Sequence, residues 1–492
     1  MENRLDILLV NPGNKLSQFG NVSSYATVAQ PLGVAMLASY IRERGFSVAI
    51  LDAEAENWSP EEATDNILKY DPKLVGLTAF TTKVTAAGKI MRLVKERAPH
   101  IKTVIGGHHA SAMPRRTLEE EAADFVINGE GYYPTSGLLE TLKNDPNAKE
   151  FPIRGVCYKR DNEIVLNPPA LLTDSGSLAK LSFPAWDLLP MKKYQAHHWQ
   201  CWNIGQKNSF ALVYSSLGCP FSCNFCSVNV VYGKRGVRYL DPEIFVKGID
   251  HLVQNHGIKH LELIDDTFTL NKKRVVEICD LLADRKYNLN MWCFARTNTV
   301  EPAMADKMKK AGINWVFLGI EAGDDNILKS VSKHQDTDIV RKAVKILKES
   351  GIYVGGNYVF GLAEDNYESM QKTVDFALEL NTEWANFFVS MAYPGTKLYA
   401  DAVGKGVLPK KWEQYGFFAP NSLPLPSKHL PSEEIIKFRD KAFNTYFGSA
   451  SYQSLVREKF GPEIEEYIKK MLTKKLERVP SPEREEISLS IA

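Results

Sequence analysis

The sequence lacks several features that would place it in a familiar class. No apolar run reaches the roughly 18–20 residues of a membrane-spanning helix, and no signal peptide is visible, so we expect a cytoplasmic protein without a membrane span. The 60 basic residues almost balance the 59 acidic ones, leaving a net charge of +1. This balance argues against nucleic acid as the main partner, because phosphate binding needs a basic surface.

Common nucleotide-binding motifs are also missing. The first predicted strand is not followed by G-x-G-x-x-G, which argues against a dinucleotide site, and the phosphate-loop pattern G-x-x-x-x-G-K-S/T is absent. Cysteine is scarce, at seven of 492 residues, and nothing indicates an oxidising compartment. Four of the seven are scattered, and we interpret each as a small buried apolar residue. They are Cys157, Cys201, Cys279 and Cys293.

The other three cysteines lie within eight residues. Cys219, Cys223 and Cys226 form the pattern C-x3-C-x2-C, and no second C-x2-C or H-x3-H follows, as a closed four-ligand zinc site would require. Thiolates favour iron–sulfur clusters, zinc or copper. A four-iron cluster held by three thiolates keeps one iron open to activate a small molecule. A structural metal knuckle or a disulfide cluster is the alternative interpretation.

Residues 1–145 alternate short apolar strands with amphipathic helices. This alternation predicts a doubly wound, Rossmann-like parallel sheet, which binds ligands beyond the carboxyl ends of its strands. The loops at those ends are rich in glycine and hydroxyl side chains, which let a large ligand approach the backbone. The predicted strands are Leu5–Val10, Phe46–Asp52, Leu74–Phe80, Thr103–Ile105 and Asp124–Ile127.

Prolines interrupt the pattern over residues 146–208, which we interpret as a linker with a small hairpin around Asp161-Asn162. Histidines and aromatics crowd its end and either cover a cofactor or pack between two domains. They are His197, His198, Trp199, Cys201 and Trp202. Six strands then alternate with helices over residues 209–405, which predicts a partial, open (β/α)6 barrel of the TIM type. The predicted strands are Phe210–Ser215, His260–Ile264, Leu289–Ala295, Trp315–Ile320, Tyr353–Phe360 and Ala385–Ser390.

Residues 406–492 form a helical C-terminal extension. A helix is predicted over Ser432–Thr445, and Phe417–His429 is expected to wrap over the barrel mouth. A later apolar stripe indicates a helix docked on the surface or, alternatively, one that contacts a membrane surface. The stripe comprises Ile464, Tyr467, Ile468, Met471, Leu472, Leu476 and Val479. Residues from Ser481 onward are expected to be disordered.

The cysteine pattern, with Phe225 before its last cysteine, resembles that of radical S-adenosylmethionine (radical SAM) enzymes. Three later segments resemble strand-end motifs of that family: Ile264-Asp265-Asp266-Thr267-Phe268, Gly319-Ile320-Glu321-Ala322-Gly323 and Tyr393-Pro394-Gly395-Thr396. Gly106-Gly107-His108 and Gly129-Glu130-Gly131 resemble loops of the cobalamin-binding domain that precedes the barrel in one subgroup. No D-x-H-x-x-G follows the first strand, so a histidine ligand to the lower face of cobalt is not predicted.

The resemblance implies that Cys219, Cys223 and Cys226 hold a 4Fe-4S cluster whose fourth iron binds SAM. Implied SAM contacts are Phe225, Asp265, Asp266, Arg296 and Glu321. Asp265 or Asp266 alternatively caps the next helix. Implied cobalamin contacts are Pro12, Thr78, Thr81, Thr82, Gly106, Gly107, His108, Gly129, Glu130 and Gly131. The alternatives are that His108 and His109 are polar loop residues and that the whole domain is a docking module without a cofactor.

The resemblance therefore implies a cobalamin-dependent radical SAM enzyme. The leading hypothesis is a C-methyltransferase that acts on an unactivated carbon through a 5'-deoxyadenosyl radical and methylcobalamin. The alternatives are cyclisation, oxidation or rearrangement without methyl transfer, as in the anaerobic magnesium-protoporphyrin cyclase, and a non-catalytic cobalamin or iron–sulfur protein. The expected partners are a small-molecule, lipid or tetrapyrrole substrate and an electron donor of the flavodoxin or ferredoxin type.

Overall fold

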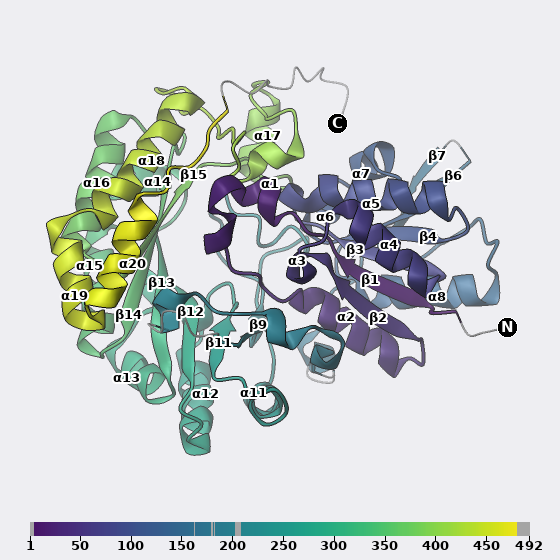
Figure 1. The fold of residues 1–492 in the computed structure, drawn as a ribbon, viewed down its shortest axis with the longest axis horizontal. Coiled ribbons are helices and arrows are strands. Elements are labelled where there is room, and N and C mark those ends of the chain that lie inside the picture. Colours follow the sequence, from purple (N-terminus) through teal and green to yellow (C-terminus); the bar gives the residue numbers. More distant parts are fainter. Residues whose placement is uncertain (1–3, 162, 179–180, 182, 202–207, 480–492) are drawn as a thin grey trace.

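Two large sheets, each with its own helices, lie beside one another (Figure 1), and the described residues also form a small sheet of two short strands. The structure, a computed structural model, describes residues 4–161, 163–178, 181, 183–201 and 208–479. The expectations for Asn162, Trp202 and the segment from Ser481 lie outside these residues. Among the helices described, none combines the length and the apolar character needed to cross a membrane.

The first sheet has seven strands in the order β2-β1-β3-β4-β5-β6-β7. Its first five strands are parallel, as predicted: β1 (Ile7–Asn11), β2 (Val48–Asp52), β3 (Leu74–Thr78), β4 (Lys102–Gly106) and β5 (Phe125–Ile127). Alternate residues of β1 enter different cores, because side chains alternate across a strand. Ile7 and Leu9 pack in the core that contains α2 (Leu32–Glu43), whereas Leu8 and Val10 pack with the other helices. Those other helices are α4 (Pro60–Tyr70) and α5 (Val84–Arg97). The doubly wound fold is confirmed.

The hairpin expected in the linker continues this sheet. β6 (Val156–Arg160) pairs antiparallel with β5, and β7 (Glu163–Leu166) pairs with β6. The hairpin joins the sheet because this pairing buries Val156 and Cys157 completely against the first domain. The boundary after residue 145 remains a prediction, and the sheet itself extends to Leu166.

The second sheet has six strands in the order β15-β14-β13-β12-β11-β8. All neighbouring pairs are parallel, and β8 and β15 remain edges, which confirms the partial barrel. The strands are β8 (Phe210–Val213), β11 (His260–Leu263), β12 (Asn290–Arg296), β13 (Ile313–Glu321), β14 (Tyr353–Phe360) and β15 (Trp384–Val389). At the β8 edge, the Gln30 side chain donates to the Phe210 carbonyl (2.6 Å) and accepts from the Leu212 amide (2.9 Å). A side chain therefore replaces a neighbouring strand there.

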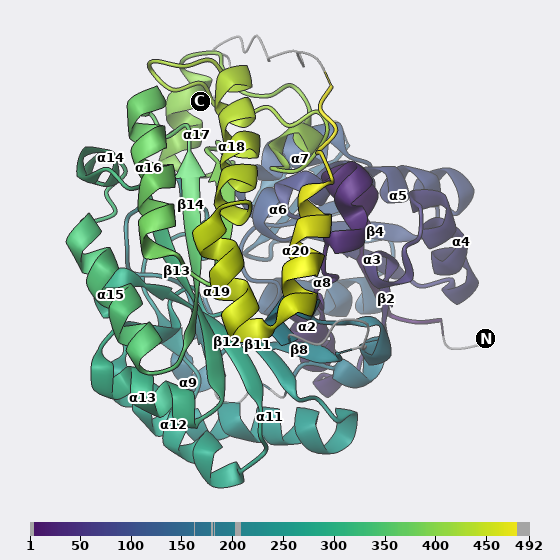
Figure 2. The same cartoon turned by 60° about the vertical axis from the view of Figure 1, so that its left-hand side comes forward.

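Three helices of the extension pack on the barrel (Figure 2). They are α18 (Ser432–Phe447), α19 (Ala450–Phe460) and α20 (Pro462–Leu472). Phe460 lies 6.3 Å from the ring of Trp315 on β13, and Ile464 and Ile468 are buried in the barrel core. The apolar stripe thus docks as predicted, but the helix ends at Leu472, so Leu476 and Val479 lie beyond it. Helix α19 was not predicted.

A buried hydrogen-bond network ties the linker to the first sheet. The hydroxyl of Tyr194 donates to Asp52 Oδ2 (2.6 Å), and Asn11 Nδ2 donates to Asp52 Oδ1 (2.7 Å). Asp52 also caps α3 (Ala53–Glu56). Because Asp52 and Tyr194 are almost inaccessible to solvent, each group depends on the other for its hydrogen bond.

We expect Tyr194→Phe to lower the free energy of unfolding by about 1–3 kcal/mol, because a buried carboxylate oxygen loses its donor. The measurement is urea denaturation followed by fluorescence. Tyr158→Phe is the control, since the Tyr158 hydroxyl makes only a 3.4 Å contact with Glu150. Equal losses in the two variants would contradict the assignment.

Candidate active site

The carboxyl ends of the two sheets meet at one place. Gly395 follows β15, and a Cβ atom added to it would lie 2.8 Å from Val230, just after the cysteines, and 3.4 Å from Ala112 in α6 (His108–Ala112). Gly129 follows β5, and its added Cβ would lie 3.6 Å from the Val231 carbonyl. Loops from the first sheet, the cysteine loop and the last barrel strand are therefore in contact.

The start of the cysteine loop is held by backbone contacts. β9 (Ser216–Leu217) pairs with β10 (Arg238–Tyr239), so the loop leaves and returns at one short ladder. Gly218 has a φ of +91°, and an added Cβ would lie 2.4 Å from the Gly236 carbonyl. Only glycine fits this position without a shift of the backbone. Asn229 Nδ2 donates to the Cys219 carbonyl (2.9 Å).

The end of the loop lies against the barrel strands. The Asn224 carbonyl accepts a hydrogen bond from the Leu398 amide (3.1 Å), and the Asn224 amide donates to Val331 (3.4 Å). Phe225 packs in an apolar cluster with Ala322 after β13 and Val359 near the end of β14. The contact of Phe225 with SAM remains a prediction.

The three thiols fit an iron–sulfur cluster. All seven cysteines are free; Cys219 and Cys223 are half-buried, and Cys226 is exposed. Partial enclosure by the protein nevertheless raises the pKa of Cys226 to about 11. Within the described residues, no three His, Cys, Asp or Glu side chains converge on one metal ion. A four-iron cluster does not need such convergence, because each thiolate binds a different iron.

Arg296 connects β12 to the cysteine loop. Its Nη1 lies 3.4 Å from Cys223 Sγ, and its guanidinium carbon lies 3.8 Å from the centroid of the Phe221 ring. Its Nη2 donates to the Lys333 carbonyl. Arg296 is buried, so it places a desolvated positive charge beside the thiols, where hydrogen bonds to sulfur tune a cluster.

Glu321 ends β13 in a strained conformation. Its φ is +69°, and Ser332 and His334 also have positive φ values of 57° and 53°. Lys333 Nζ lies 2.6 Å from Glu321 Oε1, with both side chains buried. A Cβ atom on Gly319 would lie 2.8 Å from both charged groups. Backbone strain of this kind gathers at functional sites. The sequence analysis did not identify Lys333, which contacts the predicted SAM residue Glu321.

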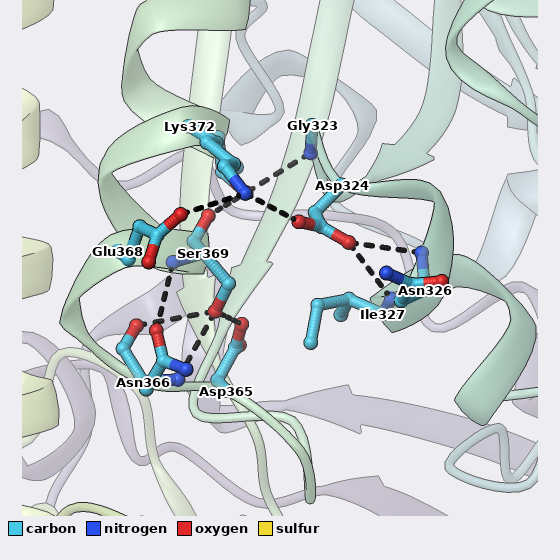
Figure 3. Close-up of polar contacts among 10 residues, drawn as sticks. Gly323, Asp324, Asn326, Ile327, Asp365, Asn366, Glu368, Ser369 and Lys372 are labelled. Carbon is cyan, nitrogen blue, oxygen red and sulfur yellow. Dashed lines mark hydrogen bonds and ion pairs between the residues drawn. The ribbon is translucent and has the colours of Figure 1, made fainter.

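Hydrogen bonds anchor the loops that follow β13 and β14 (Figure 3). The Gly323 amide donates to Thr373 in α16 (Tyr367–Leu380), and Asp324 pairs with Lys372 of the same helix at 3.2 Å. Buried Asp365 accepts from the Ser369 hydroxyl (2.6 Å). These contacts hold the backbone on both sides of the strand ends and limit the freedom of Glu321.

The two consecutive aspartates hold the cysteine loop. Asp265 is buried and accepts from the Ser215 amide (2.8 Å), the Ser215 hydroxyl (2.6 Å) and the Ser216 hydroxyl (2.5 Å). Asp266 accepts from the Gly218 amide (3.0 Å), and burial raises its pKa to about 6. Asn271 caps the next helix, so the helix-cap alternative was wrong for both aspartates. Their predicted SAM contacts remain predictions.

Most of the predicted cobalamin residues lie together at the carboxyl edge of the first sheet. Gly107 has a φ of +101°, and an added Cβ would lie 2.9 Å from the Ala79 carbonyl. His108 stacks on Phe80 at 4.9 Å, and burial lowers the pKa of His108 to about 4. Phe80 is 59% exposed, and the sequence analysis did not identify it. The same edge carries Pro12, Thr78, Thr81, Thr82 and Gly106.

His109 is buried in α6 and contacts side chains, so its alternative interpretation as a polar loop residue was wrong. Its Nδ1 lies 3.3 Å from the Thr81 hydroxyl, and the ring of Trp412 meets it edge-on at 4.6 Å. Burial lowers the pKa of His109 to about 3, so the imidazole is neutral near pH 7. The extension thus supports the Thr81 loop through Trp412.

Glu130 differs from the other predicted cobalamin residues. Its Oε1 accepts from Arg238 Nη2 (2.5 Å), and its Oε2 accepts from the Thr173 amide (2.8 Å). Both carboxylate oxygens therefore have partners within the protein. Gly131 next to it begins α8 (Tyr132–Asn144).

We expect Lys333→Met to lower the free energy of unfolding by about 3–5 kcal/mol, because it leaves the Glu321 carboxylate buried without its counter-charge. The denaturation midpoint of the purified protein tests this. The second substitution Glu321→Gln in the Lys333→Met variant is expected to restore part of the loss. Lys345→Met removes an exposed pair with Glu349 and serves as the neutral control. A loss no larger than that of the control would refute the buried-pair assignment.

Comparisons with known proteins agree with this geometry. Two family models match the chain: "B12 binding domain" over residues 20–139 and "Radical SAM superfamily" over residues 213–377. An uncharacterized methyltransferase of Pyrococcus horikoshii is 32% identical over 423 residues, which cover 86% of this chain and 88% of that protein. The anaerobic magnesium-protoporphyrin IX monomethyl ester cyclase of Rubrivivax gelatinosus is 27% identical over 400 residues, or 80% and 70% of the two chains.

A solved structure has a similar fold. The radical S-adenosylmethionine methyltransferase TsrM of Kitasatospora setae, solved with cobalamin and a 4Fe-4S cluster, matches with a TM-score of 0.67 at 17% identity, over 82% of this chain and 78% of that one. At 17% identity, this match shows a similar fold and nothing more. Both family models and a relative that is 32% identical along most of its length show that the chain belongs to the cobalamin-dependent radical SAM methyltransferase family.

Proposed function

We propose that this enzyme transfers a methyl group to an unactivated carbon of a small-molecule substrate. One observation carries the proposal: the loops after β4 and β5 contact the cysteine loop and the loop after β15, through Gly395, Val230, Ala112 and Gly129. A ligand on the first sheet and a ligand on the cysteine loop therefore face the same space. A reaction that uses both ligands needs this proximity.

The residues of the barrel suit the radical half of the reaction. Cys219, Cys223 and Cys226 would hold the cluster, and Arg296, Glu321 and Phe225 would position SAM. Arg296 offers a cation for a carboxylate, Glu321 accepts hydrogen bonds from ammonium or hydroxyl groups, and Phe225 offers an apolar surface. When bound, the cluster with SAM supplies a 5'-deoxyadenosyl radical, and cobalamin supplies the methyl group.

The residues of the first sheet suit a corrin. Pro12, the threonines of β3 and η2 (Thr81–Lys83), Gly106, Gly107 and His108 would line it, and Phe80 adds an exposed apolar ring. The positive φ of Gly107 lets its backbone stand close to a large flat ligand. His108 is neutral at physiological pH, because burial disfavours its charged form.

We also propose the division of the chain and its partners. Residues 1–145 form the cobalamin domain, 146–208 the linker, 209–405 the radical SAM barrel and 406–492 the extension. The substrate is a small molecule, with lipids and tetrapyrroles among the candidates, and a flavodoxin or ferredoxin supplies electrons. Cyclisation without methyl transfer is the second candidate, supported by the 27% identity to the Rubrivivax cyclase.

Anaerobically purified enzyme from cells supplied with iron and hydroxocobalamin is expected to contain about four irons and one corrinoid per chain. Cys219→Ala, Cys223→Ala and Cys226→Ala are each expected to lose most of the iron, whereas Cys279→Ala, which removes a buried thiol outside the loop, keeps it. Iron, sulfide and cobalt assays give the answer. Iron without corrinoid in the reconstituted wild-type enzyme would rule out the cobalamin assignment.

Product mass separates the two candidate reactions. With SAM, a reductant and the true substrate, methyl transfer increases the substrate mass by one methyl in place of hydrogen, and 5'-deoxyadenosine accumulates. Cyclisation adds no methyl group. Mass spectrometry of reactions run with methyl-deuterated SAM makes the distinction, and a product that carries no deuterated methyl would favour the cyclase.

A further inference from the structure

We propose that Glu130 and Arg238 form a clamp that couples cobalamin binding on the first sheet to SAM binding at the cysteine loop. In this assignment Glu130 is a positioning residue and does not contact the corrin. The inference rests on the proposed function, because it assumes the two cofactor sites described above.

The first half of the clamp lies in the predicted cobalamin loop. Glu130 stands between Gly129 and Gly131, and only 7% of its surface is exposed. Its two carboxylate oxygens have separate partners: Arg238 Nη2 at 2.5 Å and the Thr173 amide at 2.8 Å. The carboxylate therefore turns from the loop toward the barrel and has no oxygen left without a partner.

The second half lies at the base of the cysteine loop. Arg238 is paired with Leu217 in the β9–β10 ladder, and Leu217 lies two residues before Cys219. Its Nη1 donates to the Thr173 carbonyl (2.6 Å), and its guanidinium carbon lies 4.9 Å from the centroid of the Tyr232 ring. The contacts of the Arg238 guanidinium hold the β9–β10 ladder in place, and the cysteine loop starts from this ladder.

The burial of the pair indicates a positional role. The side chains of Arg238 and Glu130 are 14% and 6% exposed. A buried ion pair contributes little net stability, because desolvation of the two charges offsets their attraction. A planar guanidinium with several fixed donors does, however, define the distance and orientation of the two loops. A ligand that orders residues 129–131 therefore also orders the cysteine loop, and the effect is reciprocal.

The test measures the dissociation constant of SAM on cluster-reconstituted, full-length enzyme without reductant, with and without saturating hydroxocobalamin. In the wild type, hydroxocobalamin is expected to tighten SAM binding by about fivefold or more. Glu130→Gln and Arg238→Met are each expected to reduce this factor to near one and keep wild-type iron and corrinoid contents. Arg238→Lys, which retains the charge, gives an intermediate factor, and the double variant is no worse than either single one.

Glu121→Gln is the matched control, since Glu121 is also 7% exposed and pairs with Arg92 inside the first domain. In this variant, hydroxocobalamin is expected to tighten SAM binding by the same factor as in the wild type. An unchanged factor in Glu130→Gln, or no coupling in a wild type that binds both ligands, overturns the clamp and leaves the proposed function intact. Loss of corrinoid from Glu130→Gln also overturns it, because that result makes Glu130 a cobalamin contact. A wild type that binds no corrinoid refutes the proposed function itself.

Discussion

The parallel strands of the two large sheets have their carboxyl ends beside one another, and the rest of the molecule supports that arrangement. Parallel strands point all their carboxyl ends to one side, so each sheet has a single edge for ligands. The linker and the Trp412 segment contact the first domain near this edge: Tyr194 bonds to Asp52, and Trp412 contacts His109. The free edge of β8 is satisfied by Gln30 from the first domain. The first domain thereby covers this open edge of the barrel in place of a further strand.

Several buried charged groups lie around this space. Asp265 orders the strand end before the cysteines, Lys333 pairs with Glu321, and Arg238 pairs with Glu130. Each charge is costly to remove from water unless it is paired. The protein uses these pairs where loops must keep a defined geometry, and glycines occupy the points where loops touch. Three positive φ values at Glu321, Ser332 and His334 show that the same region also carries backbone strain.

Much of the fold followed from local patterns. The start of α4, for example, is defined by neighbouring residues, because Ser59 and Glu62 form a capping box just before and after Pro60. The strands β1–β5 and the six barrel strands were found with small errors at their ends. The hairpin was correctly predicted but its pairing with β5 was not, because pairing depends on residues distant in sequence. Helix α19 was missed. The end of α20 was predicted too late, because Leu476 and Val479 keep the helical spacing although they lie beyond the helix.

The sequence by itself determined the class of chemistry, because three cysteines at fixed spacing and glycine-rich strand ends depend only on local order. It also determined the alternation of strands and helices, which follows from the period of apolar residues. The tertiary structure decided which polar side chains bond to one another. Glu130 and Asp265 are ligand contacts implied by the sequence, and only the structure shows that their oxygens also bond Arg238 and Ser215, residues that are remote along the chain. Lys333 entered the site for the same reason: only folding brings its ammonium group to Glu321, and a buried charge is defined by its spatial partner.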